Sequence, residues 1–417
     1  MSNYTVVKRS RCRLCSSSDV VQVMHFEAVP FFDEVVVSGS KGQEFNYPMA
    51  LFFCNSCLSL QTQHDVNFNE YYESYQYIAS NSAFIKNYMA KIVNYCINNL
   101  GISHNDKVIE IGSADGYLLS LFQNEGLEVL GFEAANNLCE IASNKGVSSV
   151  NALFGIESFN LIPPEFHEVE LLVLLHTFDH LSDPEPFMDT VRLILNSERG
   201  VLLLEVHDLD DIYAKHESSL FGHEHAIYLH YGSIKRFLER NGFRILDFNF
   251  IPKAECRGSS MLVAATLEGS ELISNPNLNC FENPKLDKIS TYTEFQASVA
   301  RSFLRVRTYV ETNKREKGRR FAGYGGWGRA ITTLAMAGLD HNHLEFMVDS
   351  NSQLHGLFTP ISGLKIVGRE YVTRDFIDEI IVFNYGYYDE ICKIHSEFIA
   401  SGGRIVSVID VFFDLCR

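Results

Sequence analysis

The sequence lacks long apolar runs, an excess of basic residues and an apolar N-terminal stretch. No run approaches the roughly 18 residues of a membrane-spanning helix, and the polar start MSNYTVVKRSRCRLC does not resemble a secretory signal. With 35 basic residues against 52 acidic ones, the net charge is −17. This charge disfavours binding to a phosphate backbone as the main task. We therefore expect a cytoplasmic monomer that binds neither nucleic acid nor membranes.

The length of 417 residues predicts two or three domains, and 46% apolar residues are enough for ordinary hydrophobic cores. The sequence contains no solenoid repeat and no low-complexity tract. We expect domain boundaries near residue 70 and near residues 250–255. This division gives an N-terminal module (1–70), a central domain (71–252) and a C-terminal domain (253–417).

Ten cysteines in a cytosolic chain are more often thiols or metal ligands than disulfides. Four of them form two CxxC pairs, Cys12, Cys15, Cys54 and Cys57. Two such pairs place four thiolates on two turns that close a tetrahedral site. The sequence therefore predicts a structural zinc ion with a full set of ligands, and strand-like residues at 20–37 fill the long loop between the pairs.

The segment KVIEIGSADG (107–116) reads as a short strand that runs into a glycine turn. A helix pattern follows, and the next strand ends at Glu133. A glycine turn lets a ligand approach the backbone, and an acidic residue after the second strand suits ribose hydroxyls. The ExGxxxG form is typical of S-adenosylmethionine (SAM) methyltransferases. The predicted cofactor-binding residues are Glu110, Gly112, Ser113, Asp115, Gly116, Glu133 and His176.

Seven of the fifteen histidines lie between residues 176 and 230, at or beyond the ends of strands expected at 169–176 and 200–207. In open α/β sheets ligands bind outside the carboxyl ends of the strands, and a histidine there can act as a base. The centre of the group is His223-Glu224-His225, in which a neighbouring carboxylate can raise the pKa of an imidazole and fix its tautomer. A second metal held by these histidines is an alternative.

The order CxxC…CxxC, EIGSADG, HTFDHLSDP and HEH resembles the sugar C-methyltransferases of deoxysugar biosynthesis, which act on nucleotide-linked 4-keto-6-deoxyhexoses. The resemblance extends over nearly the whole chain and includes GYGGWGRA followed by FMVDSN. It implies an α/β fold with a zinc-binding N-terminal module, a Rossmann-like class I methyltransferase core and a C-terminal Rossmann-like domain. It also implies SAM as cofactor and a nucleotide-sugar, expected to carry dTDP, as substrate.

By this resemblance, His225 is the base, Glu224 orients it, and His180 stabilises the enolate oxygen. The family often carries a tyrosine where this chain has Gly222, so another tyrosine is expected to serve. The candidates are Tyr75, Tyr77 and Tyr228.

The C-terminal domain departs from the family on the side expected to face the substrate. The family has a lysine after the glycine-rich turn, where this chain has Gly328-Arg329. The family also has a histidine-glycine-glycine-serine stretch, where this chain has Arg-Gly-Ser-Ser at 257–260. Residues 301–320 hold eight basic side chains, which indicate either a solvated helix face or a flank for a nucleotide diphosphate.

Three alternative functions remain at this stage. An O- or N-methyltransferase on the same scaffold would need less help from a base. A scaffold protein with an inactive methyltransferase fold is opposed by Asp115, Glu133 and the Glu224-His225 pair. An NAD oxidoreductase would use Gly323, Gly325 and Gly328 as a GxGxxG turn, which alone is weak evidence.

Overall fold

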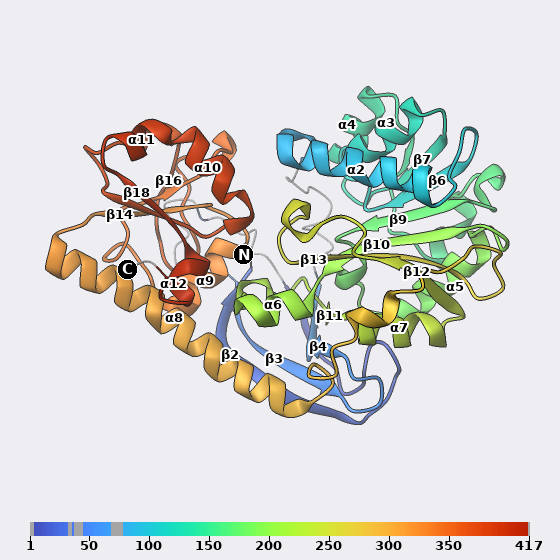
Figure 1. Cartoon of the computed structure of the whole chain (residues 1–417), viewed down its shortest axis with the longest axis horizontal. Helices are drawn as coiled ribbons and strands as arrows, with labels where there is room; N and C mark the ends of the chain where they lie inside the picture. Colours follow the sequence, from blue (N-terminus) through green and yellow to red (C-terminus); the bar gives the residue numbers. More distant parts are fainter. Residues whose placement is uncertain (1–3, 32–35, 37–44, 68–77, 416–417) are drawn as a thin grey trace.

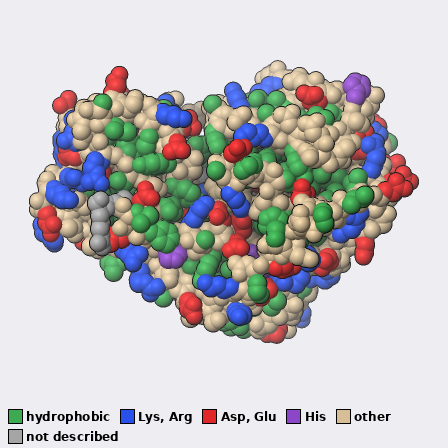
Figure 2. All heavy atoms as spheres, viewed as in Figure 1, with side chains coloured by type: hydrophobic (Ala, Val, Ile, Leu, Met, Phe, Trp, Pro, Cys, Tyr) green, Lys and Arg blue, Asp and Glu red, His purple; other side chains and the backbone are tan. Residues whose placement is uncertain are grey.

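The computed structural model describes residues 4–31, 36, 45–67 and 78–415, and it arranges them in three parts (Figure 1). The N-terminal module lies at the bottom of the view, a seven-stranded sheet lies at the right, and a five-stranded sheet lies at the left. The space-filling view is hollowed at its upper edge between the two larger parts (Figure 2). The predicted α/β class with two Rossmann-like parts and a small N-terminal module is confirmed.

The N-terminal module is built on a four-stranded antiparallel sheet in the order β11-β4-β3-β2. Its strands are β2 (Val20–Pro30), β3 (Asn46–Cys54), β4 (Leu60–Thr62) and β11 (Ile227–Tyr228), and β1 (Val6–Lys8) pairs with β5 (His64–Val66). Strand β2 accounts for most of the strand expected at 20–37, and residues 32–35 and 37 lie outside the described residues. Strand β11 follows directly on the His223–His225 segment, so the module's sheet supports that segment.

The central sheet has seven strands in the order β12-β13-β10-β9-β6-β7-β8. They are β6 (Lys107–Ile111), β7 (Glu128–Phe132), β8 (Ser149–Val150), β9 (Leu171–Leu175), β10 (Val201–His207), β12 (Phe243–Phe248) and β13 (Ser260–Leu267). All neighbours pair in parallel except at β13, which is antiparallel to both β10 and β12. Strands β9 and β10 are buried along their whole length, as expected when both faces are covered.

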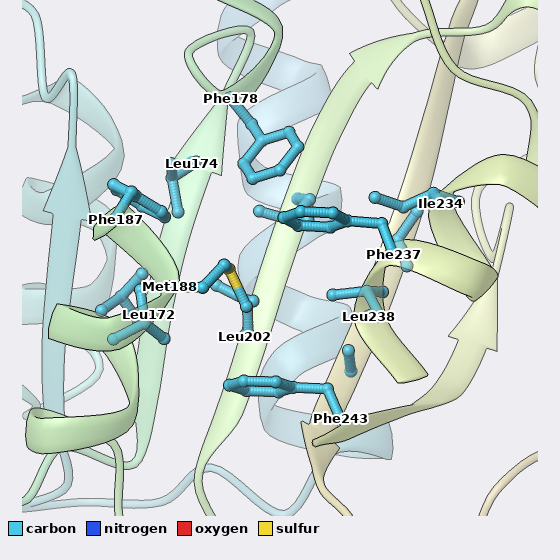
Figure 3. Packing of buried hydrophobic residues seen from close by; sticks show 14 of the residues in the cluster. Leu172, Leu174, Phe178, Phe187, Met188, Leu202, Ile234, Phe237, Leu238 and Phe243 are labelled. Atoms are coloured by element: carbon cyan, nitrogen blue, oxygen red, sulfur yellow. The ribbon is translucent and has the colours of Figure 1, made fainter. Parts of the chain in front are cut away.

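Helices cover both faces of this sheet. They are α2 (Ala83–Asn99), α3 (Tyr117–Asn124), α4 (Asn136–Asn144), α5 (Pro184–Ile194) and α7 (Tyr231–Arg240). Helix α6 (Leu209–Lys215) instead packs Leu209 and Ile212 against the N-terminal module and α8. On one face, Leu172 and Leu202 pack against Met188 of α5 and Phe237 of α7 (Figure 3). Alternate strand residues point to the other face, where Val173 lies in a separate cluster with residues of α2 and α3.

The boundary predicted between residues 252 and 253 does not coincide with the edge of the central sheet. Strand β13 lies beyond that boundary but fills the position between β10 and β12. Strand β13 is a continuous apolar run, as a buried strand of either sheet would be. The sequence pattern therefore could not show to which of the two sheets it belongs. The central sheet therefore extends to Leu267.

The C-terminal part contains five parallel strands in the order β16-β15-β14-β17-β18. They are β14 (Phe321–Tyr324), β15 (Met347–Val348), β16 (Ile366–Val367), β17 (Glu379–Val382) and β18 (Arg404–Ser407), with helices α8 (Ile289–Lys317), α9 (Arg329–Ala337), α10 (Tyr388–Ile394), α11 (Ser396–Ala400) and α12 (Val408–Phe412). Helix α8 runs along this part to the N-terminal module, where Gln296 bonds both backbone polar groups of His25. Within the described ranges, no helix is long and apolar enough to cross a membrane.

Candidate active site

The four cysteines of the two CxxC pairs lie together in the N-terminal module. Their sulfur atoms are all within 4.8 Å of one another, and Cys12 Sγ lies 3.5 Å from Cys57 Sγ. Both pairs form the same turn, in which Ser16 N donates to Cys12 O and Leu58 N donates to Cys54 O. A compact set of four thiols on two matched turns fits a tetrahedral zinc ion and leaves no ligand position open for a substrate.

A cavity of about 1000 Å³ lies where the three parts meet. The central sheet contributes the residues that follow β6, β7, β9 and β10, while His64 comes from the N-terminal module and Trp327 and Tyr387 come from the C-terminal part. The cavity therefore lies outside the carboxyl ends of the parallel strands, where ligands of open α/β sheets bind.

The glycine turn after β6 forms one wall of this cavity. Gly112 has φ +72°, and a Cβ atom there would lie 2.4 Å from Thr177 Oγ1, so a side chain would be strained and would have to displace Thr177. The carboxylate of Glu133 holds the turn from β7, because its two oxygens accept hydrogen bonds from Ala114 N (2.8 Å) and Ala135 N (2.9 Å).

Three predicted cofactor residues carry buried polar atoms beside this turn. Glu110 Oε2, Ser113 Oγ and Asp115 Oδ1 have no hydrogen-bond partner among the described residues. Burial, followed by the charges of Asp115 and Glu133, raises the pKa of Glu110 well above its usual range. The raised pKa favours the neutral form of Glu110, and Asp115 pairs with Lys145. The unpartnered polar atoms therefore fit a ligand with several hydrogen-bonding groups, such as SAM.

Two other predicted cofactor residues have different surroundings. Gly116 does not line the cavity, and a Cβ there would lie 2.8 Å from Ala142 Cβ, so this glycine allows close packing of α3 and α4. His176 does line the cavity, and its Nε2 lies 3.1 Å from Ser260 Oγ and 3.2 Å from Glu205 Oε1.

The predicted catalytic residues His180, Glu224 and His225 all line the cavity. The ring centroids of His180 and His225 lie 5.0 Å apart. His225 Nδ1 lies 2.7 Å from the carbonyl oxygen of Leu220. A carbonyl only accepts, so Nδ1 carries the proton and Nε2 carries the lone pair of the neutral ring.

The structure corrects two expectations, that Glu224 raises the pKa of His225 and that Glu224 orients its ring. Burial lowers the pKa of His225 to about 3 instead of raising it, and the ring is oriented by a backbone carbonyl. His223 belongs to a buried pair in which its Nδ1 lies 2.7 Å from His64 Nε2, and its Nε2 lies 2.9 Å from Val29 O. His223 therefore fixes this segment to the N-terminal module.

The tyrosine candidates lie in different regions of the chain. Tyr75 and Tyr77 are outside the described residues. Tyr228 is buried in β11, and its hydroxyl donates to Gly222 O and accepts from Gly222 N. It does not line the cavity.

The sequence analysis did not single out the pair formed by Asp179 and His207. Asp179 Oδ2 accepts from His207 Nδ1 at 2.6 Å, and both residues are buried. Ligand atoms of His176, Asp179 and His207 lie within 4.8 Å of one another. The short contact between Asp179 and His207 is that of a hydrogen-bonded pair, because two ligands around one ion are held further apart.

The C-terminal part closes the cavity with Trp327, Arg329 and Tyr387. Arg329 Nη1 donates to Glu217 Oε1 at 2.8 Å, and the other oxygen of Glu217 accepts from Ser259 Oγ at 2.6 Å and from the Tyr385 hydroxyl. None of the eight basic residues at 301–320 lines the cavity, so this segment is no flank for a diphosphate there.

Comparisons with known proteins agree with this arrangement. Family models match residues 12–72 (a zinc binding domain), 82–247 (a methyltransferase domain) and 277–409 (a C-methyltransferase C-terminal domain). The chain is 26% identical over 400 residues to the C-methyltransferase NovU of Streptomyces niveus, covering 95% of this chain and 94% of that protein.

Solved structures similar to part of the chain include two SAM-dependent methyltransferases. The one from Clostridium acetobutylicum is 14% identical with a TM-score of 0.36, covering 46% of this chain and 94% of that chain. The one from Archaeoglobus fulgidus is 16% identical with a TM-score of 0.36, covering 43% of this chain and 93% of that chain. The order of the three matched domains confirms the predicted resemblance, and the chain belongs to the SAM-dependent C-methyltransferases with a zinc-binding N-terminal domain, a methyltransferase core and a C-methyltransferase C-terminal domain.

Proposed function

We propose that this C-methyltransferase methylates the carbon next to the ketone of a nucleotide-linked 4-keto-6-deoxysugar, with dTDP as the expected nucleotide. The observation that carries the proposal is the cavity of about 1000 Å³, which is lined by the glycine turn, by several histidines and by the C-terminal part. The glycine turn suits a methyl donor, the histidines suit a proton transfer, and the C-terminal part suits the nucleotide end of a substrate. The C-methyltransferase NovU supports carbon as the methylated atom.

The reaction requires a base, because a carbon atom becomes a good nucleophile only after a proton next to the carbonyl has been removed. His225 suits this role, since its Nδ1 donates to Leu220 O and its Nε2 holds the lone pair. Its pKa of about 3, lowered by burial, keeps the ring neutral at pH 7. His180 is proposed to donate to the enolate oxygen, together with Tyr75 or Tyr77, and Glu224 is proposed to act beside His225.

The methyl donor is proposed to occupy the wall formed by the glycine turn. SAM supplies a methyl group on a positively charged sulfur. Gly112 allows a ligand to approach the backbone, and Glu133 has further lone pairs for ribose hydroxyls. Glu110, Ser113 and Asp115 offer unpartnered polar atoms to the cofactor beside this turn. Holding two reactants together is worth up to about 7–11 kcal/mol in favourable cases.

The nucleotide is proposed to lie against the C-terminal part. Arg329 of the C-terminal part and Arg257 of the central part line the cavity and suit a diphosphate, while Trp327 and Tyr387 offer aromatic faces to a base. The zinc ion is proposed to be held by Cys12, Cys15, Cys54 and Cys57, and its role is structural.

The test is mass spectrometry of the products formed from SAM and a panel of nucleotide-linked keto-sugars. A hydrogen next to a ketone exchanges with solvent when an enolate forms, so deuterium should also enter one ring carbon when the demethylated cofactor product replaces SAM. His225→Asn should lower both exchange and methylation by about 10²–10⁴-fold, and His180→Asn should have a milder effect.

His104→Asn is the matched control, because His104 is exposed and does not line the cavity. If no sugar on the panel exchanges but a methylated oxygen or nitrogen is found, the O- or N-methylation alternative replaces this proposal. Wild-type exchange in His225→Asn would instead mean that another residue is the base.

A further inference from the structure

The pair formed by Asp179 and His207 lies at the carboxyl ends of two adjacent strands. Asp179 is in the short turn at Phe178–His180 after β9, and His207 is the last residue of β10. Asp179 Oδ2 lies 2.6 Å from His207 Nδ1 and 3.3 Å from His207 N. The carboxylate therefore fixes both the backbone and the ring of His207, and it leaves the lone pair of the neutral ring on Nε2.

The charges around His207 come from several elements. Asp179 is fully buried, yet the histidines around it, above all His207, hold its pKa below the usual range, so it is an anion. His176 and Arg329 face His207 and oppose its protonation, and the ring centroid of His225 lies 4.3 Å from that of His207. Burial lowers the pKa of His207 to about 4, although Asp179 acts in the opposite direction.

The two neighbouring histidines differ in how well they can carry a positive charge. His225 donates from Nδ1 to the neutral carbonyl of Leu220, whereas His207 donates to a carboxylate. In a buried site an imidazolium ion needs an anion nearby, because it has lost its hydration. The proton taken from a substrate is therefore held at lower free energy on His207 than on His225.

We propose that His207, oriented by Asp179, is a second catalytic residue that receives the substrate proton from His225 and holds it while the methyl group is transferred. This inference rests on the proposed function. The C–H bond next to the ketone breaks, and its electron pair stays on the enolate while the proton bonds to Nε2 of His225. The proton then moves to Nε2 of His207. The enolate carbon forms the new C–C bond as the S–CH₃ bond of the cofactor breaks, and that bond's electron pair stays on sulfur, which leaves as a neutral thioether.

Asp179 acts through His207 and is therefore a positioning residue. Its charge favours the protonated form of His207, so replacing it with a neutral amide must lower the pKa of that ring. The acidic limb of the pH–rate profile should then move to lower pH, while the maximal rate falls because the base is weaker. A purely structural role would lower stability or raise KM without moving this limb.

The experiment measures deuterium exchange and methylation from pH 3 to 9, a range that includes the pKa of about 4 of His207, in wild type, Asp179→Asn and His207→Asn. His207→Asn keeps a donor for Asp179 but cannot hold the proton, so both rates should fall by about 10²-fold. Asp179→Asn should lower kcat and shift the acidic limb downwards with little change in KM. Asp189→Asn is the matched control, since Asp189 is exposed and pairs with Arg192.

Circular dichroism and SAM calorimetry check that each variant folds, and His207→Gln replaces His207→Asn if the latter does not. Wild-type exchange rates in either His207 variant, or an unmoved acidic limb in Asp179→Asn, would overturn this role of the pair and leave the proposed function intact. Absence of exchange in wild-type protein with every keto-sugar would overturn the proposed function, and this inference with it.

Discussion

Glu133 combines two tasks in one side chain. Its carboxylate fixes the glycine turn through two backbone amides, and the same group faces the cavity. Burial raises the pKa of Glu133, and the hydrogen bonds from Ala135 and Ala114 oppose this rise because they favour the ionised form. The residue is therefore suited both to shape the turn and to accept from a ligand.

Replacing Glu133 with alanine should weaken SAM binding by about 1–3 kcal/mol, because charge-assisted hydrogen bonds are lost. Titration calorimetry measures this change. Glu128→Ala is the control, since Glu128 is exposed at the start of the same strand. Unchanged SAM affinity in Glu133→Ala would place the cofactor elsewhere.

At the scale of the element, the turn between β6 and α3 depends on Gly112 for two reasons, its positive φ and its contact with Thr177. Gly101 separates these reasons, because it has the same φ of +72° but no atom within 4 Å of an added Cβ. The left-handed backbone costs roughly 1–2 kcal/mol for a residue with a side chain, and a steric clash adds typically 1–3 kcal/mol.

We therefore expect Gly112→Ala to lose more unfolding free energy than Gly101→Ala, and to lose SAM binding as well. Urea unfolding followed by calorimetry tests both expectations. Equal losses in the two variants would mean that the contact with Thr177 is relieved by a small shift of that side chain.

The two CxxC turns also allow a prediction, which concerns the metal content and the stability of the N-terminal module. Purified protein should carry about one zinc ion per chain, bound by four sulfurs. Cys54→Ser should lower both the metal content and the thermal stability. Cys280→Ser should change neither, because Cys280 is exposed and lies outside the cluster. Metal analysis that finds no zinc in protein purified without chelators would contradict the assignment.

At the scale of the whole molecule, the buried carboxylate of Glu217 joins the central and C-terminal parts. It accepts from Ser259 of the central part and from Arg329 and Tyr385 of the C-terminal part. Breaking a buried ion pair by removing one partner typically costs about 3–5 kcal/mol, since the other charge is left uncompensated.

Glu217→Ala should therefore lower the unfolding free energy by about this amount, whereas Glu311→Ala should leave it nearly unchanged. Glu311 pairs with Arg307 on the exposed surface of α8, so it serves as the control. Denaturant unfolding measures both variants, and similar small losses would mean that the three contacts of Glu217 do not hold the two parts together.

Features that depend on neighbouring residues could be predicted from the order of the amino acids. The spacing of the CxxC pairs predicted the cysteine cluster, and the run from Lys107 to Glu133 predicted a strand, a turn, a helix and a second strand where β6, α3 and β7 are found. Such patterns are readable because hydrophobic periodicity and turn chemistry act over a few residues.

Contacts between side chains that are far apart in the sequence could not be predicted in this way. The bond of Asp179 with His207 follows from the parallel pairing of β9 and β10, and the bond of His64 with His223 joins residues from different parts. Burial then lowered the pKa of His225, which its neighbour Glu224 had been expected to raise. Strand order and burial are set by the packing of the whole chain, so no local pattern reveals them.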